Sequence, residues 1–454
     1  MPHRDHCLAP SRTVDAPLGP HAYGRLCPDL PPLASEEAAL WAVGGPGGAC
    51  DGGPFADPEG GDDAVETAAG WPFFGQFVAH DITADRSLPA HRVDAASLRN
   101  ARNPTIDLEC LYGDGPTGNP YLYDRDDPAR FLLGRNDAGF PDDLPRNQQG
   151  VALVGDPRND VHLFVSQLHV AMLKLHNALV DRLRAKGVAE ADLFEGARES
   201  ARWHYQWVVL RDFLPRLIGP EMVDDLLGGG PRFLPAGGPL TIPLEFADAA
   251  YRYGHSQIRH RYRPNAASDP LPLFPDLVGF GPVPAARAVD WALLFDLPGR
   301  PPAQRAKRID GRLARSLIEL PLAITGEVEV DAYHSLAVRD LQRGLGTGLP
   351  SGEAVARRIG VEPLHPDEVG LAAGGWEGET PLWFYVLKEA EACEAGERLG
   401  PVGGRIVGEV LVGLVDRDPG SYRASDPSWR PTLPVTGPGP FGLADLLAVA
   451  AEPG

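Results

Sequence analysis

The most regular pattern of apolar positions in the chain lies between residues 159 and 186. Leucine and methionine recur there at mostly three- to four-residue intervals, at Leu163, Leu168, Met172, Leu175 and Leu179. This spacing gives an α-helix one apolar stripe and predicts a buried helix. Similar patterns predict further helices over 64–83, 196–217, 245–262, 304–320, 331–344, 352–359, 379–393, 401–415 and 441–451. Strand-like alternation is sparse, so the pattern predicts a mainly α protein.

The N-terminal segment differs from the rest of the chain. Residues 1–62 are dense in proline, glycine and aspartate, show little periodicity and end in the glycine-rich stretch 44–61. This composition predicts an extended arm over 1–62. No later linker is long enough to force a domain break, so residues 63–454 are predicted to form one large domain.

Charge and composition exclude several classes of partner. The 454-residue chain has a formal net charge of −20, which repels phosphate backbones and makes nucleic-acid binding an unfavourable interpretation. The sequence has no run of 18 apolar residues, and its first residues lack the apolar core of a secretory signal. We therefore expect a cytoplasmic protein without a membrane span, while export by a non-standard route stays open.

The segment 71–81 is the first candidate for chemistry. Gln76 and His80 are four residues apart, so on a helix both side chains project from one face. Asp81 follows directly and points to another side. The functional interpretation is a reaction chamber lined by Gln76 and His80; the alternative is an ordinary buried histidine whose polar atoms are satisfied in the core.

Two further segments place charged or imidazole side chains one helical turn apart. Arg252 and His255 share a face, and Gly254 leaves a surface without a side chain beside His255, where a flat ligand can approach. Asp340 and Arg343 form a second such pair, and a carboxylate of this kind can accept the Nδ1–H of a metal-bound imidazole. The alternatives are surface charges on a helix and an intrahelical ion pair.

Arg158 lies at the start of the long predicted helix. Pro157 precedes it and favours the first turn of a helix, which fixes where the arginine stands. An arginine held near a histidine base can stabilise the negative charge of a departing hydroxide. Arg158 is therefore a candidate partner of His80.

Oxygen-bearing residues alternate in the segment 103–109. An extended chain sends alternate side chains to one side, so these oxygens can face one space. Together with Asp81 they suit a hard cation such as calcium; the residues are Asn103, Thr105, Asp107 and Glu109. A polar strand edge is the alternative explanation of the alternation.

These segments occur in an order that resembles a known superfamily. The motifs within 75–81, 107–113, 155–160, 252–255 and 340–344 are similar, in this order, to those of the animal-type heme peroxidases, and in particular to their bacterial branch. The likeness runs from about residue 25 to the C-terminus. It implies a single, mainly helical domain in which heme is buried between helices.

The resemblance also implies roles for individual residues on the two sides of the heme. His80 would be the distal histidine, Gln76 its neighbour above the iron, and Arg158 the distal arginine. His255 would be the axial iron ligand and Asp340 the partner of its other nitrogen. The resemblance further implies propionate contacts at Arg252 and Arg343, and a calcium site formed by Asp81, Asn103, Thr105 through its carbonyl, Asp107 and Glu109.

The implied activity is the reduction of hydrogen peroxide coupled to oxidation of small organic donors or soft halides. The mammalian members attach heme through an aspartate, a glutamate and a methionine at positions that hold Ala79, Val161 and His162 here. The resemblance therefore implies non-covalent heme b. Asp160 lies one residue from the glutamate position, so an ester at Asp160 stays open at this point.

Two other functions remain as alternatives. A fatty-acid dioxygenase shares the expected fold, but it needs a tyrosine three residues before the axial histidine, and Arg252 occupies that position between Tyr251 and Tyr253. A heme-binding scaffold with decayed catalysis is the second alternative, and the presence of His80 and Arg158 counts against it. The donor and the oligomeric state cannot be read from the residues.

Overall fold

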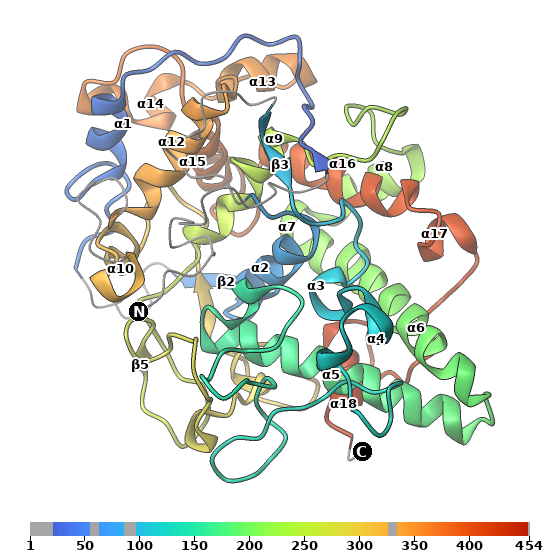
Figure 1. The fold of residues 1–454 in the computed structure, drawn as a ribbon. Coiled ribbons are helices and arrows are strands. Elements are labelled where there is room, and N and C mark those ends of the chain that lie inside the picture. Colours follow the sequence, from blue (N-terminus) through green and yellow to red (C-terminus); the bar gives the residue numbers. More distant parts are fainter. Residues whose placement is uncertain (1–20, 55–62, 86–96, 326–333, 453–454) are drawn as a thin grey trace.

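The computed structural model describes residues 21–54, 63–85, 97–325 and 334–452, which form the mainly helical fold that the apolar pattern predicts (Figure 1). The α-helices are α1 (Glu37–Gly44), α2 (Trp71–Ile82), α3 (Glu109–Tyr112), α4 (Gly115–Gly118), α5 (Leu163–Ala185), α6 (Leu193–Val208), α7 (Leu214–Ile218), α8 (Pro220–Gly229), α9 (Leu244–Ala247), α10 (Arg315–Ile318), α11 (Leu322–Thr325), α12 (Leu336–Gly346), α13 (Gly352–Ile359), α14 (Pro366–Val369), α15 (Leu382–Glu394), α16 (Pro401–Arg417), α17 (Tyr422–Ser425) and α18 (Leu443–Ala450).

Short antiparallel strand pairs join distant parts of the chain. They are β1 (His21–Ala22) with β3 (Arg99–Asn100), β2 (Asp63–Ala68) with β6 (Arg305–Lys307), and β4 (Arg261–Tyr262) with β5 (Leu271–Pro272). The pairing of β2 with β6 brings the residues just before α2 next to a segment more than 200 positions later.

The long helix predicted over 159–186 is α5, which begins four residues later at Leu163. Its N-cap is His162, whose ring accepts the backbone N–H of Val165. Helices α2, α6 and α18 pack against α5. Among the described helices, α5 alone has the length and apolar composition of a membrane span, but 89% of its most apolar window is buried inside the protein.

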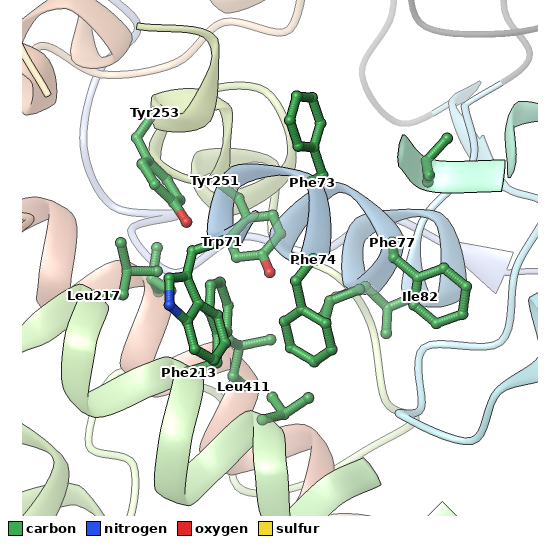
Figure 2. Close-up of a cluster of buried hydrophobic side chains, with 14 of the residues drawn as sticks. Trp71, Phe73, Phe74, Phe77, Ile82, Phe213, Leu217, Tyr251, Tyr253 and Leu411 are labelled. Carbon is green, nitrogen blue, oxygen red and sulfur yellow. The ribbon is translucent and has the colours of Figure 1, made fainter. Parts of the chain in front are cut away.

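Helix α2 is anchored by a cluster of aromatic rings (Figure 2). Pro72 lies in its first turn, where its fixed φ favours helix initiation. The ring centroid of Trp71 lies 6.0 Å from that of Phe213 and 5.8 Å from that of Phe74. Phe213 ends η6 (Val209–Phe213), a π-helical turn between α6 and α7. These contacts hold α2 rigidly against the helices behind it.

The described part of the N-terminal segment packs along the body of the protein. Strand β1 pairs with β3, helix α1 contacts α12, and the backbone N–H of Leu33 bonds to the carbonyl of Leu349. Residues 37–44 are helical, so 21–54 is not extended throughout. Residues 1–20 and 55–62 lie outside the described residues, and the division at residue 62 stays a prediction.

Two of the predicted helices are wrong in part because strand pairing overrides the local pattern. The segments 64–83 and 304–320 begin with β2 and β6, and their helical parts are only α2 and α10. Just before α2, the backbone N–H groups of Ala69 and Gly70 bond to the carbonyl oxygens of Gln304 and Leu294, which lie in a distant segment. A local pattern contains no information about a partner strand that is distant in sequence.

The predicted helix over 245–262 is also wrong in its continuity. The chain forms α9, breaks at Ala249, whose φ of −136° and ψ of −84° are not helical, and continues as the 3₁₀ segment η7 (Ala250–His255). A 3₁₀ helix has three residues per turn, so Arg252 and His255 still lie above each other on one face.

The other predicted helices are confirmed. The helix over 352–359 is α13. Four more are confirmed with shifted ends: 196–217 as α6 with α7, 379–393 as α15, 401–415 as α16 and 441–451 as α18. The remaining one, 331–344, is confirmed from residue 336 as α12, and residues 331–333 lie outside the described part.

Candidate functional site

Five of the residues singled out in the sequence line one cavity of about 1030 Å³, measured out to its open mouth. Helix α2 contributes Gln76 and His80, the 3₁₀ turn η4 (Pro157–Asp160) contributes Arg158, and η7 contributes Arg252 and His255. Three segments separated by about 80 to 100 residues therefore meet at one site. A concave site in which several polar groups converge is typical of small-molecule and cofactor sites.

Asn159 sets the tautomer of His80. The amide nitrogen of Asn159 lies 3.0 Å from Nδ1 of His169, and its amide oxygen lies 2.8 Å from Nδ1 of His80. Because the amide nitrogen donates to His169, the amide oxygen accepts the Nδ1–H of His80. Nε2 of His80 is then the ring nitrogen without a proton, as a base requires.

His80 is held in its neutral form by its surroundings. The side chain is 3% exposed. Burial, followed by the positive charge of Arg158, lowers the pKa of His80 to about 3. At neutral pH the imidazole is therefore ready to accept a proton.

Asp156 fixes the position of Arg158. Its carboxylate accepts hydrogen bonds from Nε of Arg158 at 3.0 Å and from Nη2 at 2.8 Å, and also caps the backbone N–H of Arg158. Nη2 of Arg158 also donates to the carbonyl oxygen of His80 at 3.1 Å. Although burial acts in the opposite direction, the charges of Arg158 and Arg102 hold the pKa of Asp156 well below its usual range. The arginine thus stands in a fixed orientation beside His80.

Gln76 is oriented by His162. Nδ1 of His162 accepts the backbone N–H of Val165, so Nε2 carries the ring proton and donates it to the side-chain oxygen of Gln76 at 2.7 Å. The oxygen of Gln76 is thereby committed, and its amide N–H groups are the donors available to the cavity. His162 itself lines the cavity.

His255 has the partner that the sequence predicted. Its Nδ1 lies 2.5 Å from Oδ2 of the fully buried Asp340, so the Nδ1–H is donated to the carboxylate and Nε2 keeps a free lone pair. Nη1 of Arg252 lies 3.5 Å from the other oxygen of Asp340. Arg252 therefore shares the negative charge of Asp340 with the imidazole.

Arg343 lies apart from the cavity lining. Its Nη1 is 3.5 Å from Oδ1 of Asp248 and 3.9 Å from Oδ2 of Asp85, and Asp248 also pairs with Arg252. Arg252 and Arg343 are thus neighbours across one carboxylate. Of the two arginines, only Arg252 reaches the lining of the cavity.

Four of the predicted calcium residues lie in the segment 103–109, and Asp81 at the end of α2 bonds to the backbone next to it. Hydrogen bonds already occupy these side chains. Asp81 accepts the backbone N–H groups of Leu108 and Cys110. Asp107 accepts from Oγ1 of Thr105 and from the backbone of Glu109. The side chain of Glu109 accepts the backbone N–H of Asn103 at 2.7 Å. The side chain of Asn103 bonds to the ring of His21.

Negative charge nevertheless accumulates in this loop. Burial, followed by the neighbouring Asp107 carboxylate, raises the pKa of Asp81 well above its usual range, and burial raises the pKa of Asp107 to about 6. In the described part of the chain, no group of three His, Cys, Asp or Glu side chains is arranged to hold a metal ion. The loop therefore brings two acidic groups together without forming a complete coordination shell.

Sequence reasoning did not assign roles to Asn159, Asp156 and His162. Each of them positions a residue that was predicted, namely His80, Arg158 or Gln76. A signal was present, because all three lie within four residues of Arg158, in or next to a motif already noted. The contacts of Asn159 and His162 with α2 could not be read from it, since they span about 80 residues.

The cavity suits the heme that the resemblance implies. Its lining is mainly apolar, with Phe73, Phe246 and Phe274 among its side chains. A Cβ added at Gly254 would meet no atom within 4 Å, so space is open directly beside His255. Heme binding through an axial histidine requires an apolar space for a flat group and an imidazole whose Nε2 has a free lone pair. The cavity provides both.

Sequence comparisons point to one family. A model of the family described as "Animal haem peroxidase" matches residues 94–274. Thyroid peroxidase of Homo sapiens is 26% identical over 302 residues, which is 59% of this chain and 30% of that protein. A peroxidase-like protein of Margaritifera margaritifera is 30% identical over 112 residues, or 23% of this chain and 14% of that protein. The chain thus spans less than a third of the length of these relatives.

Comparison with solved structures shows the same fold. Peroxidase A of Dictyostelium discoideum superposes with a TM-score of 0.64 at 16% identity, over 88% of each chain. A fatty acid alpha-dioxygenase of Oryza sativa superposes with a TM-score of 0.61 at 15% identity, over 85% of this chain and 73% of that one. These likenesses concern the fold. Residues 94–274 match the animal heme peroxidase family, and the curated relatives of the chain point to the same family.

Proposed function

We propose that this protein is a heme-dependent peroxidase that reduces hydrogen peroxide and oxidises small organic donors or soft halides. The observation that carries the proposal is the meeting of His80, Arg158 and His255 in one cavity, each oriented by its own hydrogen-bond partner. An isolated buried histidine would need only one satisfied polar contact. Three oriented polar groups around one cavity are typical of a catalytic site.

His80 acts as the acid–base group in this proposal. Its unprotonated Nε2 accepts the proton of the peroxide oxygen that stays in the cavity and returns it to the oxygen that leaves as water. Asn159 keeps the Nδ1–H in place during both transfers. Arg158, fixed by Asp156, stabilises the negative charge that develops on the leaving oxygen.

His255 would hold the heme iron through Nε2, and Asp340 would hold the ring in the correct tautomer. Arg252, the arginine of the cavity lining, would meet a propionate of the heme. The bound heme supplies the oxidising power of the reaction, while the protein supplies orientation and proton transfer.

The test is the absorption spectrum of the purified holoprotein together with a guaiacol assay. A Soret band that shifts when hydrogen peroxide is added, and formation of coloured guaiacol product, are expected. A protein that binds heme but gives neither response is a heme-binding scaffold, and this result would overturn the proposal.

The pH dependence provides a specific prediction. The second-order rate constant for reaction with hydrogen peroxide is expected to stay constant from about pH 8 to about pH 5. It should halve only near the His80 pKa of about 3, because only the neutral imidazole accepts a proton and protonation below the pKa removes the base. Stopped-flow pH-jump measurements check this. Halving near about pH 6.5, the value of an ordinary histidine, would contradict it.

Non-covalent heme binding is a further part of the proposal. Ala79 lines the cavity but has no carboxylate to form an ester. Asp160 was the remaining candidate, and both of its oxygens accept hydrogen bonds from Arg146, at 2.8 Å and 2.9 Å. Asp160 is also absent from the residues that line the cavity. A carboxylate occupied in this way is not available to attack a heme methyl group.

Extraction with acidified organic solvent is therefore expected to release intact heme b from the polypeptide. The expected result is a colourless protein precipitate and an organic phase with the spectrum of heme b. Heme that remains on the polypeptide, found as a mass increase on the peptide containing Asp160, would contradict the prediction.

We also propose that the loop formed by Asp81 and residues 103–109 binds calcium. The support is the raised pKa of Asp81 and of Asp107, because a divalent cation would relieve the repulsion between two carboxylates that burial brings together. Binding would complete a coordination shell that the loop alone does not form. Helix α2 carries both Asp81 and His80, so the ion would strengthen the support of the distal side.

Calcium is accordingly expected to raise the melting temperature of the holoprotein. At a concentration of about 100 times the dissociation constant, the stabilisation is about 2.7 kcal/mol. Differential scanning calorimetry with calcium, with magnesium as the control ion and with EDTA measures this, and Asp107→Asn should weaken the response. Equal melting temperatures in calcium and EDTA would refute the calcium site.

The dioxygenase alternative is not favoured by the residues of the site. Its structural likeness concerns the fold at 15% identity. The position three residues before His255 holds Arg252, whose guanidinium lies 3.5 Å from Asp340. Oxygen uptake with a polyunsaturated fatty acid in the absence of peroxide would reverse this conclusion.

A further inference from the structure

A second cleft, of about 780 Å³, opens between the start of α2, the π-helical turn η6 and the chain that leads into α18. Trp71, Phe295 and Phe441 provide aromatic lining, and Arg211 and Arg216 provide positive charge. The cleft is separate from the heme cavity, whose lining includes none of these residues. π-Helical turns of this kind occur frequently at functional sites.

The lining of this cleft holds two arginines and three carboxylates, and Arg211 is the group in it that can meet an anionic part of a ligand. Three carboxylates in the lining each accept at least two hydrogen bonds from other protein groups; these are Asp212, Asp296 and Asp445. Arg211 is exposed and forms no ion pair within the described part of the chain. A guanidinium whose charge is not balanced by a carboxylate is available to bind a sulfonate or carboxylate of a ligand.

An aromatic path connects the cleft with the heme cavity. Trp71 lies in the cleft and is stacked on Phe213, with an interplanar angle of 22°. The position of a Cβ on Gly75 would be 3.2 Å from Cζ of Phe213 and 3.3 Å from the hydroxyl of Tyr253, so these two rings approach each other across the glycine. Tyr253 lines the heme cavity two residues before His255.

Trp71 and Tyr253 also share a small space between the two cavities, which both residues line. Figure 2 shows the hydroxyl end of Tyr253 directed toward Trp71, with Phe213 beside the indole. Tryptophan and tyrosine are the side chains that one-electron oxidants oxidise most readily. Both therefore stand between the site where peroxide is reduced and a cleft that is open to solvent.

We propose that the cleft around Trp71 is a second donor site, where anionic aromatic molecules give single electrons to the indole. The proposal rests on the peroxidase function proposed above. It assigns Trp71 as the residue that is oxidised and restored, Tyr253 as the link to the heme cavity, and Arg211 as the group that binds the anion.

The electron balance of this reaction closes with peroxide as the oxidant. One hydrogen peroxide takes up two electrons and two protons and gives two water molecules. Two donor molecules each lose one electron and become radicals. The two protons come from the donors or, for a donor such as ABTS that has no proton to lose, from the solvent. Trp71 loses and regains one electron in each transfer, so the protein is unchanged at the end of the cycle.

Arg216 influences the direction of electron flow. Its guanidinium lies 4.9 Å from the centre of the Trp71 ring. A nearby positive charge makes the oxidised indole less stable, so oxidised Trp71 withdraws an electron from a donor more readily. An anionic donor in the cleft would partly balance the same charge.

The first experiment uses the heme-loaded full chain with Trp71→Phe, which keeps a ring beside Phe213 but removes the indole. With ABTS, a sulfonated aromatic donor, kcat/KM should fall by about tenfold or more, while kcat/KM for guaiacol should change by less than about twofold. Trp376→Phe is the matched control and should alter neither. Rapid-freeze EPR after one equivalent of peroxide should show a tryptophan radical that is lost in Trp71→Phe.

The second experiment tests the binding role of the cleft independently of Trp71. Arg211→Ala should raise KM for ABTS without changing kcat, whereas Arg430→Ala should not, although both arginines lie over the ring of Trp207. Unchanged ABTS kinetics in both Trp71→Phe and Arg211→Ala, or a tryptophan radical that persists in Trp71→Phe, would overturn the second donor site. Failure of the unmodified protein to oxidise guaiacol would instead refute the peroxidase function itself.

Discussion

Replacement of His80 with alanine is expected to slow the reaction with hydrogen peroxide by about a hundredfold to ten-thousandfold. The reason is that His80 presents an unprotonated Nε2 to the cavity lined by Arg158, while Asn159 holds its Nδ1–H at 2.8 Å. Stopped-flow measurement of the first reaction with peroxide isolates this step from oxidation of the donor. Alanine removes the proton acceptor and leaves His255 and its bond to Asp340 unchanged.

His176→Ala is the matched control for this prediction. His176 is also fully buried and hydrogen-bonded, to Tyr112 and to the carbonyl oxygen of Ala129, but it does not line the cavity. Its replacement should lower stability and leave the rate with peroxide nearly unchanged, with the Soret band reporting intact heme binding in both variants. A decrease of less than about threefold in His80→Ala would show that another group transfers the proton.

Replacement of Asp340 with asparagine is expected to raise the Fe(III)/Fe(II) reduction potential and to lower heme affinity or activity by about 10–100-fold. The carboxylate lies 2.5 Å from Nδ1 of His255 and gives the ring partial imidazolate character, which favours ferric iron. Asparagine keeps the shape and an acceptor but loses the charge. Spectroelectrochemical titration of the holoprotein measures the potential.

Asp248→Asn is the control that separates the effect of the Asp340–His255 hydrogen bond from the effect of removing one negative charge nearby. Asp248 is buried in the same charge network, 3.5 Å from both Arg252 and Arg343, but it does not bond to His255. Its replacement should shift the potential less than Asp340→Asn does. An unchanged potential in Asp340→Asn, or equal shifts in the two variants, would mean that the Asp340–His255 bond does not control the iron.

The geometry also limits the effect of Asp340. Arg252 lies 3.5 Å from its second oxygen and takes part of the negative charge. The sequence indicated Arg252 as a propionate contact, and its place in the cavity lining is compatible with that role. Arg343 was assigned the same role, but its guanidinium lies between Asp248 and Asp85, outside the lining of the cavity. Its function is therefore better tested by changing these ion pairs.

Much of the helical framework was predictable because amphipathic periodicity is a local property. The stripe of apolar residues that predicted a helix over 159–186 faces the core in α5, and Gln76 and His80 share one face of α2 as their spacing requires. The errors occurred where a distant partner decided the conformation. Residues 63–68 form a strand because 305–307 pair with them, and 250–255 form a 3₁₀ turn after the break at Ala249.

By itself, the sequence determined which side chains stand one turn apart on the same helix and which motifs of the resemblance are present, including the place of Ala79, Val161 and His162 at the positions of the mammalian heme links. Only the tertiary structure decided which of these side chains meet. The bond from His80 to Asn159 spans 79 positions and that from His255 to Asp340 spans 85. The physical reason is that backbone geometry sets the spacing of neighbours along a helix, whereas contacts between segments depend on how all helices pack around one core.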